Sequence, residues 1–149
     1  MRKQFLVLAI FTLAVGVTLA LHAAGPEITV YKLSTCGCCG LWVEHLKKND
    51  FQVTVHEVPS VDEYKERYGV PKELESCHTA VVAGYTIEGH VPASDILRLL
   101  KERPAAKGLA VPGMPLGSPG MEGSRKDAYD VILFTADGKT SVFQHYPGN

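Results

Sequence analysis

The sequence lacks an excess of positive charge, which sets it apart from nucleic-acid-binding proteins. It has 15 Lys and Arg residues against 16 Asp and Glu residues, and two of the basic residues lie in the N-terminal segment considered below. Without that segment, 13 basic residues face 16 acidic residues, a net charge of −3. A nucleic-acid partner calls for a basic face, so this class of partner is excluded. No internal repeat or disordered tail is visible.

Cysteine is scarce, and its placement argues against structural disulfides. The four cysteines are Cys36, Cys38, Cys39 and Cys77. Four cysteines in an exported chain ordinarily suggest two disulfides. Here three of them lie within four positions, where a bridge closes no useful loop. The stretch instead holds a C-x-x-C pattern, typical of dithiol redox chemistry, and a C-x-C pattern, typical of soft-metal binding.

The first residues have the layout of a secretory signal peptide. Arg2 and Lys3 precede an apolar run over 5–21, and small residues follow at 23–25. We expect cleavage to remove residues 1–24 and to leave 25–149 as one exported domain. An uncleaved anchor is the alternative, because the run is just long enough to cross a bilayer about 30 Å thick. Membrane contact is expected only through this segment, and no cysteine near it offers a site for a lipid.

Hydrophobic patterning beyond the signal segment predicts an α/β domain. β-branched and aromatic residues favour strands at 27–33 and 51–58, and apolar residues at helical spacing predict a helix over 40–49. The cysteine cluster therefore lies where a strand leads into a helix N-terminus, whose free amides and dipole favour thiolate over thiol. Ser60 and Glu63 form an S-x-x-E capping box, which predicts a short second helix.

The next elements complete a recognisable order. Strand-like runs at 79–83 and 86–88 are typical of a hairpin. Pro92 can occupy the first turn of a helix that follows. The predicted apolar face of that helix comprises Ile96, Leu97, Leu99 and Leu100. The order strand, helix, strand, helix, strand, strand, helix is that of a thioredoxin-like or glutaredoxin-like domain, in which helices flank a mixed sheet.

The last third of the chain combines a loop with a hairpin. Residues 108–123 are rich in glycine and proline and have little periodicity, which predicts a long loop. Ligand capping is one reason for such a loop in a compact domain. Strand-like runs at 130–135 and 140–146 flank an Asp-Gly pair, which predicts a C-terminal β-hairpin.

Five short motifs together resemble the CopG family of periplasmic copper-resistance proteins, also filed as a domain of unknown function. The motifs are TCGCC at 35–39, SCHTA at 76–80, EGHVP at 88–92, GLAVPGMP at 108–115 and GSPGME at 117–122. The resemblance implies a thioredoxin-like fold, copper bound through the C-x-C-C cysteines and further ligands, and a role in copper redox handling. It also implies a periplasmic location and, as partners, copper ions and other periplasmic copper-handling proteins.

A copper site of this kind would draw its ligands from three segments. Cys36, Cys38, Cys39 and Cys77 could bridge several Cu(I) ions, since thiolate sulfur is soft and can be shared between metals. Candidate further ligands are His90, Met114 and Met121. The alternatives are that His90 caps a turn and that the methionines plug the loop onto the domain.

The remaining histidines are expected outside the site. In an extended segment His78 would point away from Cys77, so both could not easily reach one metal. His45, His56 and His145 are expected to face solvent.

Three other functions stay open at this point. A thiol-disulfide oxidoreductase would need only Cys36 and Cys39 as catalytic residues and would leave Cys38 and Cys77 unexplained. No proline enters the predicted third strand, which puts the usual peptide-docking surface of such enzymes in doubt. A structural zinc site would more naturally take two cysteines from each of two segments. A copper store or chaperone would share every ligand with a copper-dependent oxidoreductase and differ only in lacking redox cycling.

Overall fold

A computed structural model describes residues 24–149, so the predicted signal segment lies outside the described residues except for Ala24. The strands are β1 Glu27–Lys32, β2 Gln52–Glu57, β3 His78–Val82, β4 Tyr85–Glu88, β5 Gly108–Ala110, β6 Tyr129–Phe134 and β7 Thr140–Tyr146. The helices are α1 Gly37–Lys48, α2 Asp62–Arg67 and α3 Ala93–Glu102, with a 3₁₀ turn η1 at Lys72–Leu74. None of the three α-helices described has the length and apolar character that a membrane crossing needs.

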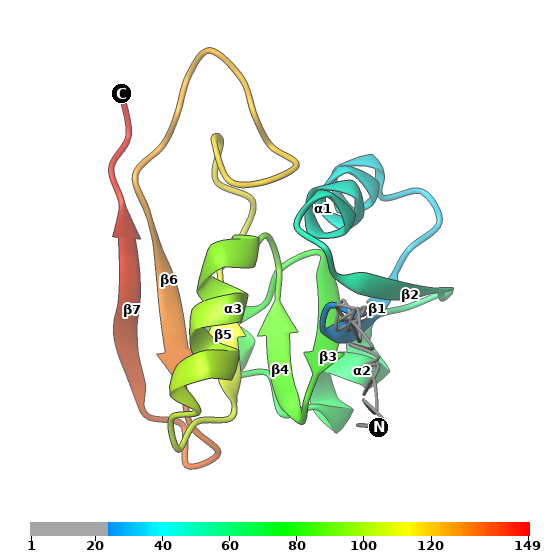
Figure 1. Cartoon of the computed structure of the whole chain (residues 1–149), viewed down its shortest axis with the longest axis vertical. Helices are drawn as coiled ribbons and strands as arrows, with labels where there is room; N and C mark the ends of the chain where they lie inside the picture. The colour runs from blue at the N-terminus through cyan, green and yellow to red at the C-terminus, as the bar shows by residue number, and fades with distance from the viewer. Residues whose placement is uncertain (1–23) are drawn as a thin grey trace, which may run out of the picture.

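The strands form one mixed sheet in the order β2-β1-β3-β4-β5-β6-β7 (Figure 1). β1 and β2 are parallel and are joined through α1, while β3 runs antiparallel to β1 and places His78 beside Lys32. β4 is antiparallel to β3 and parallel to β5, and β6 and β7 continue the sheet as an antiparallel hairpin. The predicted α/β class and the C-terminal hairpin are therefore confirmed.

The main core lies between the sheet and the two longer helices. Alternation along β1 turns Ile28 and Val30 toward this core. Trp42 of α1 and Leu99 of α3, both fully buried, belong to the same cluster. On the other face, the Tyr31 ring stacks on Tyr64 of α2, so α2 covers the sheet from the opposite side.

Two details of the predicted helices are wrong. The N-cap of α2 is Val61, and the Ser60 hydroxyl instead accepts the Asp62 N–H at 3.2 Å, so the predicted capping box does not form. Leu97 is 41% exposed, because the helical turn points it away from the sheet that buries Leu99. Pro92 lies at the N-cap of α3, one position before the helix.

The start of the predicted loop 108–123 is a strand. β5 has only three residues, which is too short for a period-2 pattern to be detected. It pairs with β4 on one side and β6 on the other, and it thereby attaches the C-terminal hairpin to the sheet. Beyond β5, the chain returns as an irregular loop past the N-terminal end of α1.

Candidate metal centre

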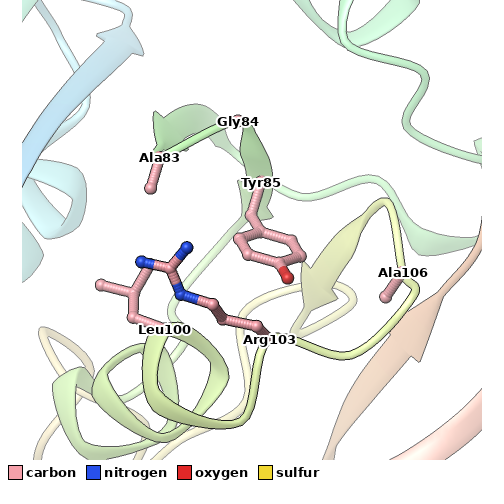
Figure 2. A pocket seen from close by; sticks show the side chains of 6 residues that line it. All are labelled: Ala83, Gly84, Tyr85, Leu100, Arg103 and Ala106. Atoms are coloured by element: carbon pink, nitrogen blue, oxygen red, sulfur yellow. The ribbon is translucent and has the colours of Figure 1, made fainter.

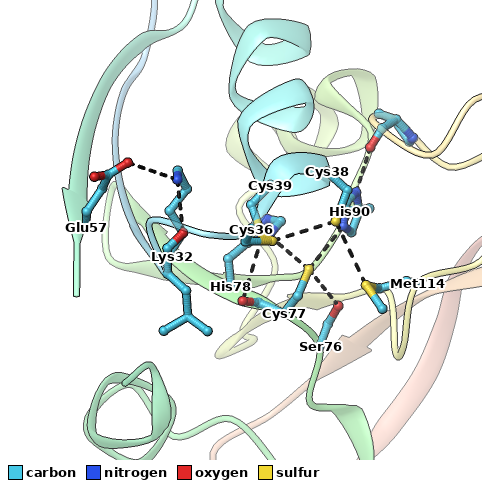
Figure 3. Close-up of a disulfide and its surroundings, with 12 residues drawn as sticks. Lys32, Cys36, Cys38, Cys39, Glu57, Ser76, Cys77, His78, His90 and Met114 are labelled. Atoms are coloured by element: carbon cyan, nitrogen blue, oxygen red, sulfur yellow. Dashed lines mark hydrogen bonds and ion pairs between the residues drawn. A yellow bond between two sulfur atoms is a disulfide. The ribbon is translucent and has the colours of Figure 1, made fainter. Parts of the chain in front are cut away.

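All four cysteine sulfurs meet at one end of the sheet (Figure 3). Cys36 is the N-cap of α1, and Cys38 and Cys39 lie in its first turn. Cys77 directly precedes β3, whose first residue pairs with the last residue of β1. The ligand atoms of the four residues lie within 4.8 Å of one another. The structure thus brings together the four thiols that the sequence predicts as a site.

Two of these cysteines form a disulfide and two are free. Cys36 and Cys39 are bridged across a Cα–Cα distance of 5.3 Å, whereas Cys38 and Cys77 are free thiols. Cys36 Sγ lies 3.6 Å from Cys38 Sγ, so the bridge and the free thiols form one sulfur cluster. The C-x-x-C and C-x-C patterns therefore share one location.

The end of α1 favours negative charge at the sulfurs. No side chain caps the first amides of α1, and its first turn holds no acidic residue. The positive end of the helix dipole is consequently uncompensated by any carboxylate of that turn. Sulfur in the thiolate form would supply the missing charge once the disulfide is reduced.

Cys77 sits in a less polar setting. Burial raises the pKa of its thiol to about 11, although the nearby Ser76 hydroxyl acts in the other direction. The Ser76 hydroxyl lies 3.8 Å from Cys77 Sγ. A soft metal that binds here must therefore displace a firmly held proton.

Two imidazoles complete a second group around Cys77. His90 Nε2 lies 3.1 Å and His78 Nδ1 3.4 Å from Cys77 Sγ, and the three ligand atoms are within 4.8 Å of one another. The prediction that Cys77 and His78 cannot reach one point is wrong, because Cys77 lies before β3 and not within its ladder. Burial lowers the pKa of both histidines, so both favour the neutral form that a metal needs.

Hydrogen bonds fix the His90 ring. Its Nδ1 donates to the Pro119 carbonyl at 2.7 Å, which leaves the Nε2 lone pair facing Cys77. His78 is fully buried, and its Nε2 has no hydrogen-bond partner among the described residues.

Trp42 packs against the His78 ring, with the two ring centroids 4.3 Å apart, and donates its indole N–H to the Val91 carbonyl at 2.9 Å. Trp42 thereby joins α1 to the segment that carries His90.

The glycine- and proline-rich loop closes over the α1 end of the cluster. Met114 Sδ lies 3.9 Å from Cys38 Sγ, and the Met114 side chain is 52% exposed. Gly120 has a φ of 87°, and a Cβ there would approach the Cys38 carbonyl oxygen to 2.7 Å and the Trp42 amide nitrogen to 2.9 Å. Only glycine permits this close approach of the loop to α1.

The two predicted methionine ligands differ in position. Met114 lies at the cluster, as described above. Met121 is half-buried, and its backbone bonds to Gly117 and Ser118 within the loop. Among residues 24–149, no hydrogen bond links the Met121 sulfur to the cysteine cluster, and its ligand role stays a prediction.

Of the three histidines predicted to face solvent, two do so. His56 and His145 are exposed. His45 is half-buried, and its Nε2 accepts the Ala93 N–H at 3.1 Å, which caps the N-terminus of α3. The sequence did not predict this capping role, because Ala93 lies 48 residues from His45 and no local pattern links the two.

The structure also contains a pocket remote from the cysteines (Figure 2). It has a volume of about 350 Å³ and lies at the turn between β3 and β4, the end of those strands opposite the sulfur cluster. Its lining consists of Ala83, Gly84, Tyr85, Leu100, Arg103 and Ala106. It offers no thiol or imidazole to a metal.

The donor atoms at the cluster suit a soft metal. Both candidate groups found in residues 24–149 consist of cysteine and histidine alone, and the nearby Met114 adds a thioether. Thiolate and thioether ligands select Cu(I) or zinc, whereas Mg²⁺ and Ca²⁺ require oxygen. The residues present therefore fit copper.

Comparisons with known proteins agree with this chemistry. A family model described as a protein of unknown function, DUF411, matches residues 74–121, which include Cys77 and His90. No curated protein matches the chain. Two solved structures of a copper resistance protein CopG, Form 1 and Form 2, are similar to it. Form 1 is 51% identical with a TM-score of 0.79, and the alignment covers 83% of this chain and 100% of that one. Form 2 is 50% identical with a TM-score of 0.79, and the alignment covers 82% of this chain and 98% of that one. The chain therefore belongs to the family of the CopG copper resistance proteins.

Proposed function

We propose that this chain is an exported protein that binds several Cu(I) ions in a thiolate-bridged site and contributes to copper resistance in the periplasm. The observation that carries the proposal is the convergence of Cys36, Cys38, Cys39 and Cys77 within 4.8 Å. Four sulfurs at such spacing can each be shared between metals. His90 and Met114 are placed to complete the ligand set.

The residues of the chain have separate tasks in this site. A bridged pair offers no thiolate, so the Cys36–Cys39 disulfide must first be reduced. An external dithiol would supply the two electrons and two protons and would itself become a disulfide. Each thiol would then lose its proton to solvent on binding, and Cys36, Cys38 and Cys39 lie at the N-terminal, positive end of the α1 dipole. Bound copper would supply one-electron chemistry between Cu(I) and Cu(II).

A thioredoxin-like fold is part of the same proposal. The strand order β2-β1-β3-β4, with β1 and β2 joined through α1 and helices on both faces, supports a thioredoxin-like unit. Strands β5 to β7 would then be an extension of that unit. On this interpretation the C-x-x-C spacing reflects the redox framework, to which Cys38 and Cys77 add metal-binding capacity.

Anaerobic Cu(I) loading tests the proposal. The reduced protein is loaded, freed of loose metal and analysed for copper per chain, beside Cys38→Ser and Cys77→Ser variants. Both variants should hold less copper than the parent, because each removes one bridging sulfur. His56→Ala is the matched control, since His56 is an exposed potential ligand that belongs to neither candidate group. Unchanged tight stoichiometry in both cysteine variants would contradict the four-thiol site.

The disulfide supports a second candidate, a thiol-disulfide oxidoreductase. Cys36 is half-exposed and Cys39 is buried, so an incoming thiolate would bond to the Cys36 sulfur and release Cys39 as a thiolate. A second thiol of the same substrate would then displace Cys36, which leaves the substrate oxidised to a disulfide and the pair reduced. Oxidation of a dithiol substrate, or disulfide reduction by the reverse steps, that depends on Cys36 and Cys39 in a protein that binds no copper would favour this function.

A copper store or chaperone would use the same ligands without turnover. Reversible oxidation and reduction of the loaded protein separates the two cases. A site that only decomposes when oxidised would indicate storage.

A further inference from the structure

A buried charged network lies on the face of the sheet that α2 covers. Lys65 of α2 and Glu88 of β4 form an ion pair whose side chains are 4% and 0% exposed. Thr79 of β3 accepts a hydrogen bond from Lys65 Nζ at 3.3 Å and donates one to Glu88 Oε2 at 2.7 Å. Desolvation offsets most of what a buried ion pair gains, so stability alone gives little reason for this network.

Glu88 also holds the main chain beside the sulfur cluster. Its Oε1 accepts the Ser76 N–H at 2.6 Å, and Ser76 directly precedes Cys77. Glu88 itself is two residues before His90. Gly89 permits this approach, because its φ is 70° and a Cβ there would come within 2.6 Å of the Ser76 Cβ. The carboxylate thus joins the segments that place Cys77 Sγ 3.1 Å from His90 Nε2.

Ser76 extends the same network to the methionine loop. Its hydroxyl donates to the Gly113 carbonyl at 2.5 Å, and the Gly113 N–H donates to the Glu75 carbonyl at 3.3 Å. Met114, the next residue, lies 3.9 Å from Cys38 through its sulfur. One carboxylate and one serine therefore connect the segments that carry Cys77, His90 and Met114.

We propose that Glu88, held by Lys65 and Thr79, is a positioning residue that sets the arrangement of Cys77, His90 and Met114 for copper binding. The inference rests on the proposed function and deepens it. Glu88 touches no ligand atom and acts through the Ser76 amide. Hydrogen-bond partners that orient metal ligands typically change metal affinity by about 10- to 100-fold when they are removed.

Two variants separate positioning from stability. Glu88→Gln keeps an oxygen that can accept the Ser76 N–H but leaves Lys65 buried without an opposite charge. The apolar variant, Lys65→Met with Thr79→Val and Glu88→Leu, removes the buried polar groups and with them the acceptor for Ser76. Loss of one partner of a buried ion pair is destabilising, whereas replacement of the whole pair by apolar residues is often neutral.

The expected results for the two variants are opposite. Glu88→Gln should melt at a lower temperature and bind Cu(I) nearly as the parent does. The apolar variant should melt above Glu88→Gln, because it leaves the Ser76 N–H without its acceptor but no buried charge without its partner. It should nevertheless bind Cu(I) about 10- to 100-fold more weakly than the parent in competition with a chromophoric chelator. Asp95→Asn is the matched control, because Asp95 of α3 is a buried carboxylate that accepts hydrogen bonds from Arg98 of the same helix and from Tyr146 of β7. It should lower the melting temperature without weakening copper binding.

The outcomes also distinguish this inference from the proposed function. A folded apolar variant with parental affinity, or affinities that simply follow melting temperature across all variants, would overturn the positioning role. If the apolar variant does not fold, the double variant Lys65→Met with Glu88→Leu decides, since it keeps Thr79 and still removes the acceptor of the Ser76 N–H. Parental affinity in this double variant would then overturn the inference. A parent protein that binds no Cu(I) overturns the proposed function, and this inference with it.

Discussion

Replacing Trp42 by phenylalanine should destabilise the domain and disturb the metal centre together. The indole is fully buried, donates to the Val91 carbonyl and packs on His78. Phenylalanine leaves the Val91 carbonyl without this donor, at a cost of about 1–3 kcal/mol. The smaller ring adds a cavity cost of about 1 kcal/mol. The total of about 2–4 kcal/mol corresponds to a fall in melting temperature of about 6–20 °C for a domain of this size.

Thermal unfolding followed by circular dichroism measures this effect, with Tyr85→Phe as the control. The Tyr85 hydroxyl donates to the Pro104 carbonyl at 3.0 Å, which is the same type of bond in a half-buried position remote from the cysteines (Figure 2). Its loss should cost about 1 kcal/mol. Trp42→Phe should also weaken Cu(I) binding, because it loosens the contact between α1 and the segment that carries His90. Equal melting temperatures for the two variants would refute the reasoning.

Two further predictions concern a histidine cap and the methionine loop. Burial chiefly lowers the pKa of His45, with Glu122 opposing and Lys48 reinforcing the shift, so the unfolded chain takes up the proton first. The contribution of the neutral His45 to the free energy of unfolding should therefore be fully present above about pH 6.5. It should decline as the pH falls from there toward the pKa of His45 in the folded protein. Urea titrations at neutral and mildly acidic pH measure this change. The free energy of unfolding should fall more for the parent than for His45→Gln, and equal falls would contradict the role of His45 as acceptor for the Ala93 N–H. Met114→Leu should weaken Cu(I) binding more than Met121→Leu in the same chelator competition, and the reverse order would place the ligand at Met121.

The sequence was most informative where a pattern repeats. Alternation along β1 and helical spacing in α1 predicted both elements to within a few residues, and their junction located the cysteine cluster. The three residues of β5 carry no such repetition, and their position is decided by pairing with β4 and β6. The attachment of the C-terminal hairpin to the sheet was therefore not predictable from local pattern.

Within the site, residue type was easier to predict than geometry. Clustered cysteine, histidine and methionine residues indicate a soft-metal site from residue type alone. Whether His78 and Cys77 reach one point depends on where the β3 ladder begins, because side chains alternate only within the ladder and Cys77 lies just before it. The contact of Glu88 with Ser76 crosses between segments and leaves no periodic trace in the sequence.

Cys77 is the residue at which the two candidate groups meet, and this makes the site a property of the fold rather than of the C-x-C-C motif. Cys77 belongs both to the sulfur group on α1 and to the imidazole group with His78 and His90. It lies 38 residues beyond Cys39, so it reaches the cluster only when β3 has paired with β1. A peptide that contains the C-x-C-C motif alone would lack both imidazoles and the thiol that connects them. Metal binding to the complete set must therefore be coupled to folding, and Cys77 is the position where that coupling should be strongest.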